Sequence, residues 1–152
     1  MDERSFQIIP LTTFLEQHGE DTVGKTLKDY NAVLESDSEH FLHDKAIEME
    51  KRALARTYLA MDEDNDIIGY VIIGIKCLKI ENTEEIDKKT AHRMNIGERN
   101  MVAQCYLLGQ LSRSAKAPKG FGKILLEVAF SELRIAKRRS VAGHFVWTAM
   151  MS

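Results

Sequence analysis

The chain has 152 residues, 44% of them hydrophobic and 29% charged, with a formal net charge of −2 at pH 7. This length predicts one domain over 1–152, and the composition excludes a disordered chain. The longest apolar run, 67–78, is shorter than the roughly 20 residues that a membrane helix needs. Without a signal-peptide core or a disulfide framework, a soluble cytoplasmic protein is expected.

The N-terminal half is expected to form a strand, three helices and a β-hairpin. Apolar spacing separates the helices from the strands, and the acidic turn 62–66 joins the hairpin strands. A capping box at Ser36 and Glu39 predicts the start of the third helix. The expected elements are a strand at 5–11, helices at 12–18, 22–34 and 39–53, and strands at 56–61 and 67–80.

The C-terminal half is expected to form a strand–helix–strand unit behind a charged excursion at 81–100. Its elements are a strand at 101–111, a loop at 112–119, a helix at 120–139 and a strand at 141–151. Together with the hairpin, this order predicts an α/β fold with a mixed, mostly antiparallel central sheet flanked by helices.

Two of the expected helices carry an apolar stripe that should face the core. In the helix at 39–53 the stripe consists of Phe41, Leu42, Ala46, Met49 and Ala53. In the helix at 120–139 it consists of Phe121, Ile124, Leu125, Val128, Ala129, Leu133 and Ala136.

Charge is unevenly distributed along the chain. Residues 113–139 include eight basic and two acidic side chains, a local charge of +6 against −8 in the rest of the chain. Such a segment is typical of a site for an anionic ligand, and equally of a solvated helix face. Charge alone does not decide between the two.

A Gly-x-Gly turn stands at the start of the helix at 120–139. Gly120 and Gly122 let an anion approach the backbone, where free N–H groups and the helix dipole favour negative charge. The turn is not a Walker A loop, because Lys123 is followed by Ile124, and it is not a dinucleotide fingerprint, because Leu125 replaces the third glycine. By itself it is equally compatible with a plain tight turn.

The context of this turn resembles the acetyl-CoA motif of GNAT acetyltransferases. The strand at 106–111, the basic loop, the Gly-x-Gly turn and the Ile-Leu-Leu that follows stand in the order of that family. The family pattern Gln/Arg-x-x-Gly-x-Gly/Ala corresponds to 117–122. The Gly-Gln-Leu at 109–111 is also similar to small GNAT proteins of bacterial plasmids and toxin–antitoxin loci.

The resemblance implies an N-acetyltransferase that transfers acetyl from acetyl-CoA to a primary amine, without a metal. The acceptor stays open between a small molecule, a protein and aminoacyl-tRNA, and a non-catalytic CoA-binding or protein-interaction module is the alternative. Leu111 and Arg113 would meet the pantetheine arm. The backbone amides that would bind the diphosphate are those of Lys119, Gly120, Phe121, Gly122 and Lys123.

The chain departs from the family pattern in two places. Ala117 replaces the first Gln or Arg, a charge that Lys116 or Lys119 could supply. The chain also stops at Ser152, where GNAT domains continue into a helix, often with a tyrosine that protonates the thiolate, and further strands. The catalytic residues therefore stay unassigned, and a C-terminally short form with an exposed final strand is expected to form a homodimer.

Other candidate residues have more ordinary interpretations. His40, His43 and Asp44 share a helix face, but no further ligand with suitable spacing is evident elsewhere in the sequence. An exposed helix face is therefore favoured over a metal site. Cysteines and strand tyrosines are expected in the core, and charged loop residues in solvent, although a glutamate could act as a base. These residues are Cys77, Cys105, Tyr70, Tyr106, Glu81, Glu84 and Glu85.

Overall fold

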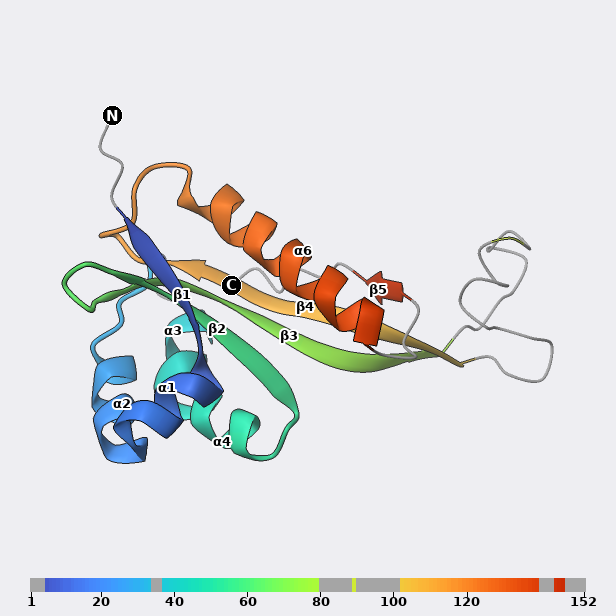
Figure 1. The fold of residues 1–152 in the computed structure, drawn as a ribbon, viewed down its shortest axis with the longest axis horizontal. Helices are drawn as coiled ribbons and strands as arrows, with labels where there is room; N and C mark the ends of the chain where they lie inside the picture. Colours follow the sequence, from blue (N-terminus) through green and yellow to red (C-terminus); the bar gives the residue numbers. More distant parts are fainter. Residues whose placement is uncertain (1–4, 34–36, 80–88, 90–101, 140–143, 147–152) are drawn as a thin grey trace.

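The computed structural model describes residues 5–33, 37–79, 89, 102–139 and 144–146 (Figure 1). A five-stranded sheet in the order β1-β2-β3-β4-β5 runs through the molecule. Its strands are β1 (Phe6–Pro10), β2 (Ala55–Asp62), β3 (Ile67–Lys79), β4 (Val102–Arg113) and β5 (His144–Val146). The helices are α1 (Leu11–His18), α2 (Glu20–Lys28), α3 (Asp37–Asp44), α4 (Ala46–Lys51) and α6 (Phe121–Arg139).

The sheet is mixed, as predicted. β1 to β4 pair antiparallel in chain order, and β5 pairs parallel to β4. The hairpin of β2 and β3 is confirmed, and its acidic turn closes on Asp62, whose carboxylate accepts hydrogen bonds from two backbone N–H groups of the turn. The α/β class with a mostly antiparallel sheet is therefore confirmed.

Helices cover both faces of the sheet (Figure 1). Helices α1 to α4 lie on one face, over a core that includes Leu11, Phe14, Leu27 and Leu42. Helix α6 lies on the other face, over a core that includes Val71 and Leu108. Each layer buries the apolar side of one set of helices against alternate residues of the same strands.

Helix α6 packs very closely on β3 at Gly69. A Cβ atom at Gly69 would lie 2.8 Å from Cδ1 of Leu125 and 3.2 Å from Cε1 of Phe121, so only a glycine lets the helix approach this far. The predicted stripe is confirmed at Phe121, Leu125, Ala129 and Leu133, which are all buried. It is wrong at Ile124, which is 37% exposed, because the buried positions repeat every four residues.

Two expected helices end earlier than their sequences suggest. The helix expected at 22–34 ends at Lys28, because Ala32 forms a bridge to Ser114 and Val33 bonds to β4. The helix expected at 39–53 is divided into α3 and α4 at Lys45.

One sequence signal behind these helices is wrong and another is not tested. Ala53 has a positive φ of 54° and an exposed side chain, so its predicted core position is wrong. The predicted capping box involves Ser36, which lies outside the described residues; among those that are described, the Glu39 carboxylate accepts the N–H of Ala32 at 3.0 Å.

Candidate functional site

A bulge interrupts strand β4 at Gly109. The pairing with β3 shifts between Ile72 and Ile73, which face Gln110 and Leu108, so that Gly109 is the extra residue. The bulge changes which face each side chain takes. Leu108 and Leu111 both contact the α6 layer, although an odd spacing would place them on opposite faces of a regular strand. Gln110 and Ser112 face the α1–α4 layer.

Beyond this bulge, the edge of β4 opposite β3 has no strand partner within the described residues. The pairing with β5 ends at Leu107 and Val146. At the other end, the N–H of Val33 donates to the carbonyl of Arg113 at 3.0 Å. The outer edge of β4 from Leu108 to Ser112, called the open edge below, is therefore bounded by β5 and by the α2–α3 connection.

After the open edge, β4 ends at Arg113, and the connection at 114–120 ends in the glycine turn before α6. Gly120 has a φ of +83°, a conformation that side chains rarely adopt, and a Cβ there would meet nothing within 4 Å. The turn uses the amides of Phe121 and Lys123, which donate to the carbonyls of Pro118 and Gly120. Within the described residues, the amides of Gly120 and Gly122 take no part in the turn's own bonds, and they are available to an anion.

The predicted cofactor residues lie around this turn, with different side-chain roles. Cδ2 of Leu111 lies 3.9 Å from where a Cβ of Gly122 would stand, so the open edge and the helix start are adjacent. Arg113, Lys119 and Lys123 are exposed. The ring of Phe121 is buried edge-to-face against that of Phe6 with centroids 5.1 Å apart. Its N–H is already bonded to Pro118, so the predicted contribution of this amide to an anion site is not supported.

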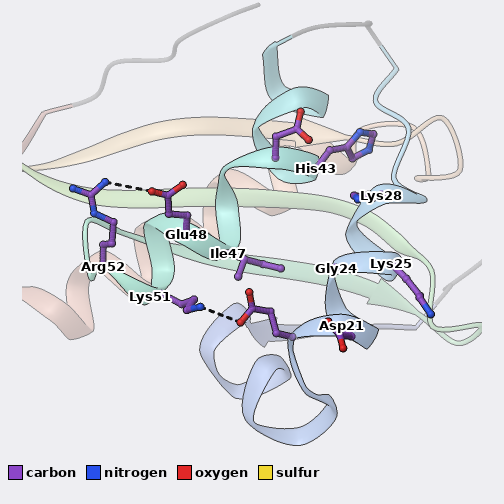
Figure 2. A pocket seen from close by; sticks show the side chains of 11 residues that line it. Asp21, Gly24, Lys25, Lys28, His43, Ile47, Glu48, Lys51 and Arg52 are labelled. Carbon is purple, nitrogen blue, oxygen red and sulfur yellow. Dashed lines mark hydrogen bonds and ion pairs between the residues drawn. The ribbon is translucent and has the colours of Figure 1, made fainter.

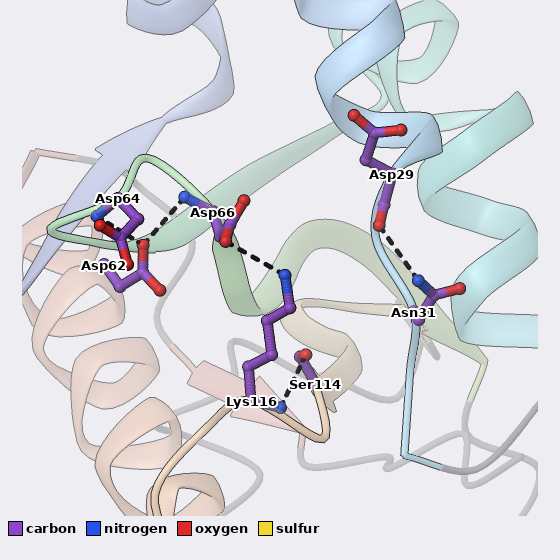
Figure 3. A network of polar contacts seen from close by, with 7 residues as sticks. All are labelled: Asp29, Asn31, Asp62, Asp64, Asp66, Ser114 and Lys116. Carbon is purple, nitrogen blue, oxygen red and sulfur yellow. Dashed lines mark hydrogen bonds and ion pairs between the residues drawn. The ribbon is translucent and has the colours of Figure 1, made fainter.

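Lys116 does not point at the glycine turn. Its ammonium lies 3.1 Å from a carboxylate oxygen of Asp66 in the β2–β3 turn (Figure 3). The hydrogen bond that Lys116 donates to Asp66 and the negative charges of Asp66, Asp62 and Asp29 raise the pKa of Lys116. The expected contribution of Lys116 to the anion site is therefore corrected: this lysine anchors the loop to the hairpin.

The sequence did not predict a buried polar cluster beside the open edge. The hydroxyl of Tyr30 lies 2.6 Å from that of Ser112, which donates to the hydroxyl of Ser38 at 3.2 Å. The hydroxyl of Tyr70 contacts the carbonyl of Ser38 and lies 3.1 Å from the side-chain amide of Gln110. All five residues are buried, which is unusual for polar groups unless they bind one another.

Burial keeps both tyrosines of this cluster protonated. It raises the pKa of Tyr30 to about 12, and the nearby charge of Glu39 adds to the effect. Burial also raises the pKa of Tyr70, with a further contribution from Tyr30. The expectation that Tyr70 and Tyr106 are packing residues is confirmed by their burial, and Tyr70 has an additional polar role.

A buried carboxylate connects α4 to α1 and β2. The Glu50 side chain is 3% exposed, and its Oε1 accepts hydrogen bonds from the N–H of Thr12 at 3.1 Å and from its hydroxyl at 2.7 Å. The other oxygen has no hydrogen-bond partner and lies 3.5 Å from the guanidinium of Arg56. This group connects α4 to α1 through Thr12 and to β2 through Arg56.

The described surface also has two polar cavities. One, of about 800 Å³, lies between α2 and the α3–α4 pair (Figure 2). Four of its charges pair with one another, Lys51 with Glu20 at 3.0 Å and Arg52 with Glu48 at 3.5 Å. The other, of about 320 Å³, lies beside the Lys116–Asp66 pair. Neither cavity brings a nucleophile and a base together.

The remaining sequence candidates are separated from the open edge or lie outside the described residues. His40 is exposed and pairs with Asp44 at 3.6 Å, and Nε2 of His43 lies 2.7 Å from the carbonyl of Tyr30. The described residues contain no group of three His, Cys, Asp or Glu that could hold a metal ion. Glu81, Glu84, Glu85 and the side chains of Cys77, Cys105, Phe145, Val146 and Trp147 are outside the described part.

No helix within the described ranges combines the length and apolar character that crossing a membrane requires. Neither a family model nor a curated protein matches this chain.

Solved structures do match the fold. AtaT complexed with acetyl-methionyl-tRNAfMet has a TM-score of 0.66 at 14% identity, over 97% of this chain and 78% of that one. A mutant of KacT has a TM-score of 0.69 at 14% identity, over 96% and 78%. AtaTR bound with AcCoA has a TM-score of 0.62 at 18% identity, over 93% and 71%. The likeness is one of fold: this chain shares its fold with these three structures.

Proposed function

We propose that this GNAT-fold chain is a cytoplasmic N-acetyltransferase that takes its acyl group from acetyl-CoA and gives it to a primary amine. The observation that carries the proposal is that the open edge of β4 lies beside the glycine turn, since Leu111 of that edge is adjacent to Gly122 at the start of α6. One continuous stretch of chain thus offers strand-edge backbone groups and then an anion-binding helix start.

The residues of this stretch fit the two parts of coenzyme A. A pantetheine arm contains two amides, which can pair with a free strand edge as a peptide does. Leu111 and the N–H of Arg113 would pair with it, since the carbonyl of Arg113 is already bonded to Val33. The diphosphate would lie on the amides of Gly120 and Gly122, which the turn leaves unused, with Lys119 and Lys123 adding charge. The cofactor itself supplies a reactive thioester.

The acceptor class that the comparisons favour is aminoacyl-tRNA, because AtaT is seen with acetyl-methionyl-tRNAfMet. Small amines and protein amines stay as alternatives. The chain's part in the reaction is to hold the amine near the open edge, which contributes through proximity. Tyr30 and Tyr70 cannot take a proton from the amine, because burial raises the pKa of both phenols and they stay protonated.

A second candidate function is binding of coenzyme A without transfer. This second function is favoured because the side chains at the open edge are uncharged and none of them can act as a general base. Gln110, Ser112, Tyr30 and Tyr70 are uncharged, and the described residues place no carboxylate or imidazole at the bulge. A positioned acid or base typically contributes about 10²- to 10⁴-fold in rate, so a module without one would bind and transfer slowly.

Transfer of labelled acetyl from acetyl-CoA separates the two functions. The acceptors are methionyl-tRNA, methionine methyl ester, a polyamine and a lysine peptide. We expect acetyl-methionyl-tRNA to form, and the Gly120→Asp variant to form none because a carboxylate occupies the anion site. Binding of acetyl-CoA without transfer to any acceptor would favour the second candidate, and no binding at all would exclude both.

A further inference from the structure

The described part of the α2–α3 connection, residues 29–33, lies against the end of β4 like a short additional strand. The N–H of Val33 donates to the carbonyl of Arg113 at 3.0 Å, and Ala32 forms an antiparallel bridge with Ser114. The N–H of Ser114 is given to β3, and successive residues of a strand alternate between its two edges. The carbonyl of Arg113 therefore lies on the outer edge of β4, where the open edge ends and the connection begins.

Arg113 is divided between the connection and the open edge. The N–H and the C=O of one strand residue point to the same edge, and only the carbonyl of Arg113 is bonded to the connection. A chain bound along the open edge can thus pair with the N–H of Arg113, and it has to leave β4 there. The glycine turn is close to this point, since Leu111 of the open edge is adjacent to Gly122.

Two side chains of α3 hold the connection in this place. Glu39 and His43 are four residues apart, so they share one face of the helix. Oε1 of Glu39 accepts the N–H of Ala32 at 3.0 Å, and Nε2 of His43 lies 2.7 Å from the carbonyl of Tyr30. A carbonyl can only accept, so Nε2 carries the hydrogen and donates it. The connection is therefore bonded to β4 through some of its backbone groups and to α3 through others.

Polar bonds, more than apolar packing, fix the position of the connection. The hydroxyl of Tyr30 lies 2.6 Å from that of Ser112, and both residues are buried, so this bond anchors the start of the connection. Further along, the side chain of Val33 is 41% exposed and contributes little packing. A single hydrogen bond typically changes an equilibrium constant by roughly two- to tenfold, so the loss of one bond from α3 should be measurable.

We infer that Glu39 and His43 are positioning residues for coenzyme A: by holding the connection on β4, they fix the point where the pantetheine arm leaves the open edge. This inference rests on the proposed function. Both side chains act through the backbone of the connection and not through contact with the cofactor. With the connection in place, an arm paired with the open edge turns at Arg113 toward the glycine turn. Without it, the outer edge of β4 continues past Arg113, and the arm is no longer aligned with the anion site.

Calorimetric titration with acetyl-CoA tests the inference on Glu39→Ala, His43→Ala and a matched control, His40→Ala. The control residue lies on the same helix, with a side chain that is 81% exposed and pairs with Asp44. Glu39→Ala and His43→Ala should each raise the acetyl-CoA Kd roughly three- to tenfold. His40→Ala should leave it unchanged. Glu39→Gln keeps an oxygen that accepts from Ala32, so this conservative variant should bind acetyl-CoA as the wild type does.

Hydrogen exchange of backbone amides separates positioning from a general loss of stability. In Glu39→Ala and His43→Ala the amide of Val33 should exchange at least threefold faster than in the wild type, because the connection opens more often. The amide of Leu125, in the buried part of α6, should exchange at the wild-type rate. In the wild type, added acetyl-CoA should slow exchange at Arg113 and leave Val33 protected.

Three results would overturn the inference and leave the proposed function standing. Faster exchange at Val33 with an unchanged acetyl-CoA Kd would show that the connection has no part in binding. Unchanged exchange at Val33 would show that Glu39 and His43 do not hold the connection. Equal acceleration at Val33 and Leu125 would assign both side chains to overall stability. A wild type that binds no acetyl-CoA would overturn the proposed function as well.

Discussion

Replacing Gly69 by alanine tests how closely helix α6 must approach the sheet. The new methyl group would stand 2.8 Å from Cδ1 of Leu125, 2.9 Å from the carbonyl oxygen of Ser112 and 3.2 Å from the ring of Phe121. Carbon atoms in contact prefer about 3.5–4.0 Å. The leucine tip can rotate, but the carbonyl belongs to β4 and the ring is buried, so the helix and strand have to separate.

The expected cost follows from two opposing effects. Overpacking of this kind costs about 1–3 kcal/mol. Alanine also lowers the conformational entropy of the unfolded chain, which stabilises the folded state by about 0.4–1 kcal/mol. The free energy of unfolding should therefore fall by about 1–2 kcal/mol, measured by urea denaturation followed by circular dichroism.

Gly74 in the same strand is the matched control. A Cβ there would meet only the carbonyl oxygen of Leu54, at an ordinary 3.6 Å. Gly74→Ala should leave the free energy of unfolding unchanged or raise it by a few tenths of a kcal/mol. If Gly69→Ala and Gly74→Ala had the same stability, the close packing of α6 on β3 would be wrong.

Three further predictions concern single polar groups. Because burial raises the pKa of Tyr30 from 10 to about 12, its contribution to stability is complete below pH 10 and lost as the pH rises toward 12. Unfolding followed over this pH range should show a drop of roughly 2–3 kcal/mol that Tyr30→Phe reduces. Lys116→Ala should weaken acetyl-CoA binding less than Lys119→Ala in calorimetry, and equal losses would refute the different roles. Glu50→Ala should cost about 1–3 kcal/mol in urea denaturation and Glu50→Gln less, since an amide oxygen can still accept from Thr12.

Local patterns made much of the fold predictable from the sequence. The hairpin and the strand–turn–helix around Gly120 depend on alternation, turn residues and helical spacing within short windows, and all are confirmed. Strand β4 extends two residues beyond its predicted C-terminal end, because Ser112 and Arg113 are polar and pair through their backbones with β3. Hydropathy reports side chains, so it does not reveal strand residues that pair only through their backbones.

The missed features of the candidate site depend on partners far away in the chain. Lys116 is paired with Asp66, 50 residues earlier, and Tyr30 bonds to Ser112, 82 residues later. A lysine before a glycine turn has the same sequence signal whether it faces a ligand or a hairpin. The bulge at Gly109 is likewise set by the register with β3, and the Gly-Gln step alone does not specify it.

Calorimetric titration with acetyl-CoA tests the central claim most directly, with Gly120→Asp as the site variant and Gly19→Asp as its control. Both glycines have a φ near +80° and open space at Cβ, so both variants place a side chain at a positive φ and add one negative charge. The account predicts that the wild type and Gly19→Asp bind acetyl-CoA alike and that Gly120→Asp does not bind. Absence of binding to the wild type at millimolar acetyl-CoA, or equal binding by all three proteins, would contradict the placement of the cofactor on this turn.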